Sequence, residues 1–260
     1  MFRENRLKRT LAAGRPAVGC WLDMASPVAA EIVGLAGYDC VVIDHEHGPG
    51  TLGDGLHLLQ ALSGTAATAV MRVPSNDPVY IKRALDLGVE GIMVPSVTSA
   101  DEARAVVAAC RYPPAGIRGA AYGLARGADY GLAGTRYRDT AADELLIICQ
   151  IETAEAVAAV PDIAAVPGVD CLFIGPYDLS GSIGRLGRFD EPAVAALLDR
   201  AERAILDTGT VYGTIPVPGR PVETLLERGC RLVVAGGDIG FVRQGAVAQV
   251  EAFRRAVEAR

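Results

Sequence analysis

Acidic side chains stand at the ends of two apolar runs of this sequence. Glu152 follows LLIICQI, and Asp178 closes CLFIGPYD. If these runs are neighbouring parallel strands, which lie ~4.8 Å apart, the two carboxylates can converge on one ion. Such a hard oxygen site suits Mg²⁺ or Mn²⁺, and Co²⁺ or Zn²⁺ could also occupy it. The alternative is that these acids cap helices or pair with arginines, and position alone leaves both interpretations open.

A histidine at the end of another apolar run is a candidate general base. The run from Tyr38 ends in Asp44-His45-Glu46-His47. His47 beside Asp44 suits proton transfer near neutral pH, and the alternative is a loop or capping histidine. Side chains alternate in direction along a strand, so only one of His45 and His47 should face a pocket. His57, inside a helical pattern, is assigned to structure.

Arginines supply the candidate anion contacts. Arg72 closes the run MRVP with no acid beside it, which favours an anionic ligand held by two hydrogen bonds. The alternative is a core salt bridge to a strand-end acid. Arg118 and Arg126, in a long loop, could also reach a carboxylate or remain solvated.

The lysines bear on the reaction type. Lys8 lies in an N-terminal helical segment and Lys82 in a helix expected on the outside of the fold, and the chain has no other lysine. A Schiff-base aldolase needs a lysine near its substrate. Electrophilic catalysis by a metal is therefore the favoured route, with no organic cofactor.

The elements that must position these residues alternate along the chain. Eight apolar, β-branched runs cover residues 17–24, 38–46, 68–74, 91–97, 145–153, 171–178, 210–217 and 231–238. Amphipathic stretches such as 27–37, 77–88, 100–110 and 191–209 separate them. This pattern predicts one (β/α)₈ TIM-barrel domain over residues 1–260, with an extra N-terminal helix over residues 3–13. Residues 112–143 should form a long irregular loop.

The composition narrows the class of protein. The formal net charge is −6 and no basic run exceeds two residues, so nucleic-acid binding is not expected. No apolar stretch is long enough to span a bilayer, and a cytoplasmic protein is expected. The six cysteines are scattered without a CxxC motif, which is typical of reduced core residues.

Several separate segments resemble the class II pyruvate-dependent aldolases of the HpcH/HpaI family. The resemblance runs from about Trp21 to the C-terminus. It rests on GYDCVVIDHEHGP, MRVPSND, IKRALDLGVEGIMVP, ARAVVAACRYPPAGIRG, QIET and GVDCLFIGPYDLSGSIG. It implies a TIM barrel and a homo-hexamer, a trimer of dimers whose last helix is exchanged between partners.

The resemblance also implies roles for single residues. Glu152 and Asp178 become the metal ligands, and His47 becomes the base-associated histidine. Asp86 becomes the acid that orients this histidine, and Asp44 another active-site acid.

The same resemblance implies how substrate is held. Arg72 steadies the pyruvyl oxygen and its enolate, and backbone groups near Gly175 and Pro176 meet the pyruvate carboxylate. The residues expected to bind substrate are Arg72, Arg126, Gln150, Gly175, Pro176 and Tyr177. His45 and Tyr177 depart from the family pattern, which leaves the aldehyde preference open.

The expected reaction is reversible cleavage of a 4-hydroxy-2-oxo acid to pyruvate and an aldehyde, through a metal-stabilised enolate. Two alternatives on the same scaffold are a CoA-ester lyase or citrate-synthase-like condensing enzyme, and a phosphate-binding barrel that uses Gly236-Gly237. A metal-dependent carboxylate-binding protein without catalysis is a third.

Overall fold

Eight parallel strands form a closed barrel in the computed structural model, which describes residues 2–259. Each strand is hydrogen-bonded to the next, and β8 returns to β1. The strands are β1 (Ala17–Leu22), β2 (Cys40–Asp44), β3 (Thr68–Arg72), β4 (Gly91–Val94), β5 (Leu146–Ile151), β6 (Cys171–Ile174), β7 (Val211–Thr214) and β8 (Leu232–Gly237). The predicted (β/α)₈ architecture is confirmed.

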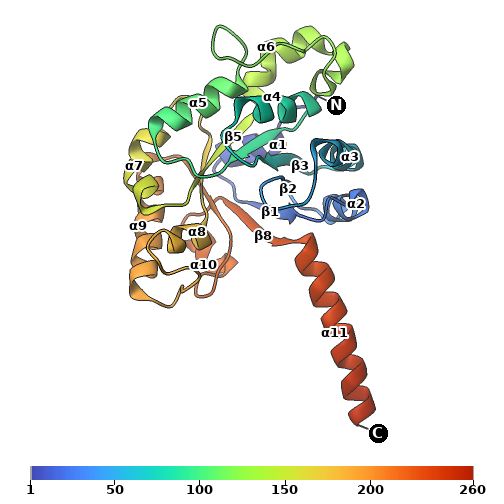
Figure 1. Ribbon diagram of the computed structural model, residues 1–260, viewed down its shortest axis with the longest axis vertical. Helices are drawn as coiled ribbons and strands as arrows, with labels where there is room; N and C mark the ends of the chain where they lie inside the picture. The colour runs from blue at the N-terminus through green and yellow to red at the C-terminus, as the bar shows by residue number, and fades with distance from the viewer. Residues whose placement is uncertain (1, 260) are drawn as a thin grey trace.

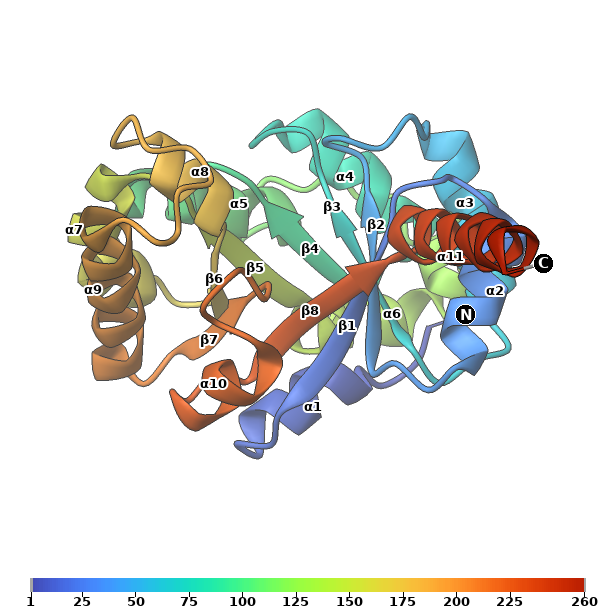
Figure 2. The ribbon, with the colours of Figure 1, turned by 90° about the horizontal axis from the view of Figure 1, so that it is seen from below.

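Helices surround the strands (Figures 1 and 2). They are α1 (Arg6–Ala12), α2 (Pro27–Leu35), α3 (Leu52–Leu62), α4 (Pro78–Leu87), α5 (Ala100–Cys110), α6 (Gly134–Glu144), α7 (Ala154–Ala164), α8 (Pro176–Gly181), α9 (Pro192–Thr208), α10 (Val222–Glu227) and α11 (Asp238–Glu258), with a 3₁₀ turn η1 (Arg126–Gly131). Single residues determine where several helices begin or end. Ser99 and Thr153 cap the N-termini of α5 and α7, and Gly88 ends α4 in the left-handed conformation.

The core has two layers because successive strand side chains point alternately inward and outward. Residues such as Val42, Met93 and Phe173 fill the barrel interior, while a larger cluster lies between the sheet and the helices. Leu7 and Leu11 of α1 join the interior cluster. The predicted extra helix therefore closes the N-terminal end of the barrel and leaves the opposite end open for a site.

Several predicted element boundaries differ from the structure. The stretch from Tyr112 to about Asp143 is not irregular throughout, because η1 and α6 occupy most of its second half. The run 171–178 is also not all strand: β6 ends at Ile174 and α8 begins at Pro176. Proline lacks an N–H and has a fixed φ, so it favours the first turn of a helix over a central strand.

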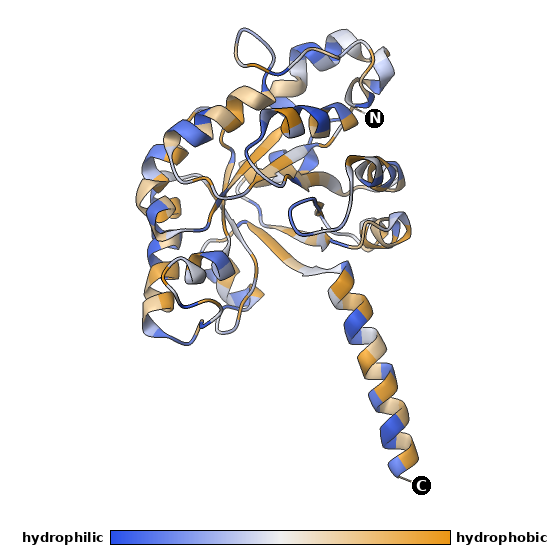
Figure 3. Ribbon diagram, in the orientation of Figure 1, coloured by the Kyte–Doolittle hydropathy of each residue, from blue (hydrophilic) through white to orange (hydrophobic). Residues whose placement is uncertain are grey.

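The last helix, α11, extends away from the barrel and has its main contacts with β1 and β8 (Figure 1). Asp238 at its start is buried, whereas Val242, Val250 and Phe253 are exposed, and apolar positions recur along its length (Figure 3). None of the helices among residues 2–259 combines the length and apolar character needed to cross a membrane.

Candidate active site

A cavity of about 450 Å³ opens at the C-terminal ends of the strands. This is the end of a parallel barrel at which catalytic residues gather. Its walls are Trp21, Asp23, Asp44, His47, Arg72, Gln150, Glu152, Phe173, Gly175, Pro176, Tyr177, Asp178 and Ile215. The structure therefore brings together every predicted site residue except Asp86 and Arg126.

Glu152 is a buried carboxylate on the β5 side of this cavity. Its Oε1 accepts a hydrogen bond from Gln150 Nε2 at 2.7 Å, and its Oε2 accepts one from the Ser96 N–H at 3.0 Å. The backbone of Gly175 lies against it, since a Cβ at that position would stand 2.5 Å from Glu152 Oε1. The side chain is thus held in one place, and position 175 requires glycine.

The electrostatics around Glu152 favour a cation. Burial and the negative charges of Glu46 and Asp178 together raise the pKa of Glu152 to about 7, against the lowering effect of the Ser96 N–H and Arg72. Asp178, in the first turn of α8, also lines the cavity. A divalent ion between Glu152 and Asp178 would relieve this repulsion, and their oxygens suit a hard metal.

The protein supplies only part of a coordination shell. Within residues 2–259, no group of three or more His, Cys, Asp or Glu side chains converges in a way that could hold an ion. Two carboxylates with water and substrate completing the shell is an arrangement typical of Mg²⁺ sites. Glu152 and Asp178 therefore fit a divalent metal that shares its shell with substrate.

Arg72 is held rigidly at the end of β3. Its Nε and Nη2 donate to the two carboxylate oxygens of Asp44 at 2.9 and 2.6 Å, and its Nη1 lies 3.0 Å from Glu46 Oε2. The guanidinium also stacks over Trp21, 4.4 Å from the ring centre. A salt bridge between Arg72 and a strand-end acid was one of the two alternatives that the sequence offered, and it is present. It directs the guanidinium into the cavity.

Asp44 is the anchor of this arrangement, and its side chain is almost fully buried. Burial alone would raise its pKa, but hydrogen bonds from Arg72 and from the backbone N–H groups of Glu46 and His47 lower it below the usual aspartate value. Asp44 therefore stays ionised and fixes both Arg72 and the turn that carries His47.

His45 and His47 face different surroundings, but strand alternation is not the reason, because residues two apart on a strand share a face. β2 ends at Asp44, and both histidines lie in the bend that follows it. His47 lines the cavity, its side chain is 68% exposed, and its Nε2 lies 4.0 Å from Glu46 Oε2. His45 is buried between the sheet and the helices, with Nδ1 2.8 Å from the Tyr80 hydroxyl. Only His47 is in a position to meet a ligand in the cavity.

Asp86 is not near His47 in this chain. It lies in the last turn of α4. In a (β/α) barrel each helix runs antiparallel to the strands, so the C-terminal end of the helix lies at the N-terminal end of the strands. There its carboxylate accepts a hydrogen bond from Arg118 Nη2 at 2.9 Å. Within one copy of the chain, the expected role of Asp86 in orienting His47 is therefore incompatible with its position.

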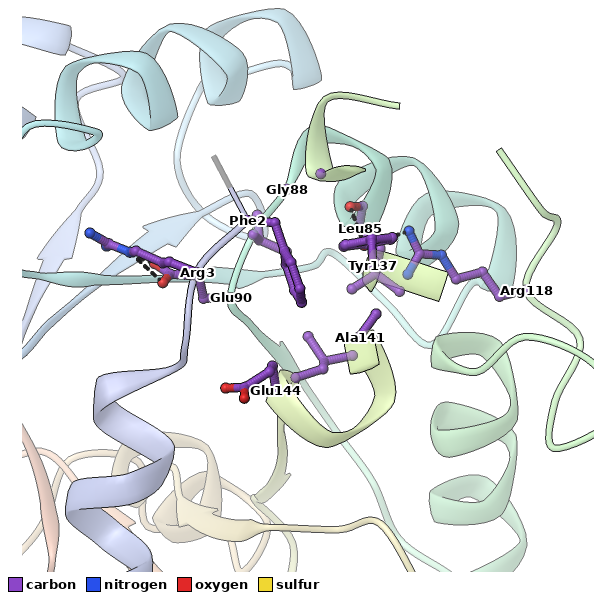
Figure 4. Close-up of a pocket in the computed structure, with 12 residues that line it drawn as sticks. Phe2, Arg3, Leu85, Gly88, Glu90, Arg118, Tyr137, Ala141 and Glu144 are labelled. Atoms are coloured by element: carbon purple, nitrogen blue, oxygen red, sulfur yellow. Dashed lines mark hydrogen bonds and ion pairs between the residues drawn. The ribbon is translucent and has the colours of Figure 1, made fainter. Parts of the chain in front are cut away.

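Arg126 and Arg118 also lie at the N-terminal end. Arg126 donates to the backbone oxygens of Leu59 and Leu87, so the structure does not place it with the substrate-binding candidates. Arg118 is buried and stacks on Tyr112 and Tyr137, 4.6 and 5.4 Å from their ring centres. Figure 4 shows the small pocket at this end, with Arg118 directed at Tyr137.

One functional candidate was missed from the sequence. Asp23 follows β1 and lines the cavity, as does Trp21 on the same strand. The rule applied to the other strands, that polar residues at strand ends face the site, would have found Asp23 in the run WLDM.

Comparison with known proteins now adds to this geometry. The family model described as HpcH/HpaI aldolase/citrate lyase matches residues 17–244. The chain belongs to this family. A relative from Cupriavidus necator, hydroxypyruvate/pyruvate aldolase, is 39% identical over 98% of this chain and 94% of its own length. The 4-hydroxy-2-oxo-heptane-1,7-dioate aldolase of Escherichia coli is 40% identical over 96% of this chain and 95% of its own.

Solved structures of the family agree. A HpcH/HpaI aldolase/citrate lyase family protein from Burkholderia cenocepacia superposes with a TM-score of 0.91 at 35% identity, covering 96% of this chain and 99% of that one. A citrate synthase, SbnG, superposes with a TM-score of 0.84 at 26% identity, covering 97% and 98%. The chain is therefore similar both to named aldolases and to a protein named as a citrate synthase.

Proposed function

We propose that this chain is a class II aldolase that cleaves 4-hydroxy-2-oxo acids to pyruvate and an aldehyde with the help of a divalent metal. One observation carries the proposal: the buried carboxylate of Glu152 and the exposed carboxylate of Asp178 share a cavity with an arginine fixed by Asp44. The two named aldolase relatives, which align over almost the whole chain, support it. Neither lysine lines the cavity, so a Schiff-base route has no candidate nucleophile.

A divalent metal would supply the electrophile in this proposal. Glu152 and Asp178 would hold Mg²⁺ or Mn²⁺, and the ion would supply positive charge for the keto and carboxylate oxygens of the pyruvyl group. Gln150 and Ser96 keep Glu152 in place through the hydrogen bonds described above. The backbone at Gly175 and Pro176, which borders Glu152, would meet the pyruvate carboxylate.

In this proposal His47 accepts the proton, and Arg72 stabilises the negative charge that develops on the enolate oxygen. The 4-hydroxyl proton passes to His47, the C3–C4 bond breaks, and the hydroxyl-bearing carbon leaves as an aldehyde. The bonding electrons move into the pyruvyl fragment, whose enolate oxygen accepts hydrogen bonds from Arg72. His47 then gives this proton to C3, which becomes the methyl carbon of pyruvate. Because Arg72 is already fixed by Asp44 and Trp21, it needs no reorganisation during the step.

Pyruvate release from a 4-hydroxy-2-oxo acid, measured with and without a chelator, tests the proposal. We expect activity to be lost in metal-free enzyme and restored by Mg²⁺ or Mn²⁺. Glu152→Gln should lose both metal binding and turnover. Glu155→Gln, an exposed position on α7, is the matched control and should retain both. Undiminished activity without metal would refute the proposal.

The same assay separates the alternatives on this scaffold. Preferential turnover of malyl-type thioesters or of oxaloacetate would favour a CoA-ester lyase or condensing enzyme instead. Inhibition by micromolar phosphate would favour a phosphate-binding barrel. Metal-dependent binding of pyruvate without any turnover would indicate a carboxylate-binding protein.

We also propose that α11 packs against another copy of the chain, in a homo-hexamer built as a trimer of dimers. Ile239, Val242, Val250, Phe253 and Val257 form one exposed stripe at helical spacing on α11. Val28, Ile32 and Leu35 form an exposed apolar ridge on α2. Exchange of α11 between two copies would cover both surfaces.

The oligomeric state tests this assembly. Phe253→Glu places a charge on the α11 stripe and should lower the mass measured by light scattering. Gln244→Glu adds the same charge on the opposite side of the helix and should leave the mass unchanged. A wild-type monomer would contradict the proposal.

A further inference from the structure

Asp23 stands across the cavity from the metal-binding candidates. It follows β1, and in an eight-stranded closed barrel β1 lies opposite β5, which leads into Glu152. Both residues line the same cavity. If the pyruvyl end of a substrate lies at Glu152 and Asp178, the rest of the substrate points towards the wall formed by β1 and β2.

The other charged groups of that wall are already paired. Both oxygens of Asp44 accept from Arg72, and the carboxylate of Asp238 accepts from the backbone N–H groups of Asp23, Met24 and Ile239 at 2.8–3.1 Å. Among residues 2–259, no N–H group or hydroxyl donates to the Asp23 carboxyl, and its hydrogen-bond contact is with the carboxyl of Asp44. It is therefore the carboxyl of this wall that no N–H group occupies and that a ligand hydroxyl can approach.

The wall also has no free cation for a second anionic group. Arg72 is engaged by Asp44 and Glu46, and it is the only arginine among the residues that line the cavity. A carboxylate brought to this wall would therefore face Asp23 without a compensating charge. A hydroxyl group brought there could donate a hydrogen bond to Asp23 instead.

We infer that Asp23 selects the aldehyde partner: it favours uncharged, hydroxylated aldehydes and disfavours aldehydes that carry a carboxylate. The inference rests on the proposed aldolase function. It implies a different preference from that of a relative named for a heptane-1,7-dioate substrate, whose aldehyde product carries a second carboxylate. Specificity of this kind arises from repulsion of the wrong substrate as much as from attraction of the right one.

A change of pH provides a second way to remove the negative charge of Asp23. Burial, the negative charges of Asp44 and Asp238, and a hydrogen bond with the Asp44 carboxyl together raise the pKa of Asp23 to about 6, against the lowering effect of Arg72. The titratable groups around it are Cys20 on its own strand, Asp44, Arg72, Asp238 and His47, which lines the same cavity. As the pH falls through about 6, Asp23 becomes neutral and the repulsion of an anionic aldehyde should weaken.

The test is aldol addition of pyruvate to glycolaldehyde, which is neutral, and to succinic semialdehyde, which is anionic. The kcat/KM ratio of the two aldehydes is compared in wild type, Asp23→Asn and Asp207→Asn, an exposed control on α9. We expect wild type and the control to prefer glycolaldehyde. Asp23→Asn should shift the ratio towards succinic semialdehyde by about tenfold or more, the size of effect expected when one close like-charge pair is removed.

The pH dependence separates a charge effect from a change of shape. The wild-type ratio should move towards succinic semialdehyde between pH 7.5 and 5.5, while the ratio of Asp23→Asn should stay constant, because asparagine does not titrate. A ratio that differs less than twofold between wild type and Asp23→Asn, or a wild-type preference for succinic semialdehyde, would overturn the inference while leaving the aldolase proposal intact. Absence of turnover with every aldehyde would refute both.

Discussion

Replacing Arg72 by methionine should destabilise the fold as well as the reaction. The Asp44 side chain is 1% exposed, and Arg72 provides two of the hydrogen bonds to its carboxylate. Without the guanidinium, Asp44 would keep only weaker backbone donors at Glu46 and His47. Breaking a buried ion pair by removing one partner costs about 3–5 kcal/mol, because the remaining charge is left in a poorly solvated place.

A double-mutant cycle isolates this interaction. Asp44→Asn in the Arg72→Met background removes the unpaired charge, so the double variant should be more stable than Arg72→Met alone. We expect a coupling free energy of about 2 kcal/mol or more between the two positions. Arg72→Lys should be intermediate, because it keeps the charge but loses the paired geometry and the stacking on Trp21.

Urea unfolding followed by circular dichroism at one fixed protein concentration is the assay, since association would otherwise change the apparent stability. The expected loss for Arg72→Met corresponds to a fall of roughly 10 °C in Tm for a chain of this size. Additive effects of the two substitutions, within about 0.5 kcal/mol, would refute the claim that Asp44 and Arg72 act as one unit.

Three further predictions follow from local contacts. Gly175→Ala should lower the rate of pyruvate release about 100-fold, because the added Cβ would displace Glu152. Gly181→Ala is the control and should have almost no effect, since its Cβ would meet its nearest neighbour at 3.4 Å. Equal activities of the two variants would contradict the account. Burial lowers the pKa of His45 in the folded state, so the unfolded state takes up a proton at a higher pH than the folded state does. The free energy of unfolding should therefore decline as the pH falls from about 6.5 towards the folded-state pKa. His45→Asn should make the free energy of unfolding less dependent on pH in that range, and an unchanged slope would show that His45 is not responsible. Burial raises the pKa of all six cysteine thiols, so an aromatic disulfide reagent should label them only after denaturation, and rapid labelling of the native protein would contradict their placement.

The barrel, and most of the residues at the C-terminal ends of its strands, could be predicted from the sequence. Parallel strands that are buried on both faces appear in the sequence as continuous apolar runs. The polar residue that ends such a run lies at the open end of the barrel, which is how Arg72 and Glu152 were found. The same rule applies to Asp23, which follows the apolar residues Trp21 and Leu22 but was not among the predicted site residues.

Residues placed by helices and loops were harder to predict. Asp86 lies in a motif shared with the family, but its position in the last turn of α4 carries it to the other end of the barrel. Arg118 is buried by Tyr112 and Tyr137, which come from different parts of a long connection. Contacts of this kind depend on tertiary packing, and sequence spacing alone does not reveal them.

The central claim is that this cavity forms the enolate of pyruvate, and proton exchange tests it without any choice of aldehyde. Pyruvate in D₂O is incubated with the enzyme and Mg²⁺, and the methyl signal is followed by proton NMR. Wild-type enzyme should replace the methyl protons by deuterium, whereas Glu152→Gln, Arg72→Met and chelator-treated enzyme should approach the rate in buffer alone. No exchange above buffer in an enzyme that releases pyruvate, or full exchange in Glu152→Gln, would contradict the account.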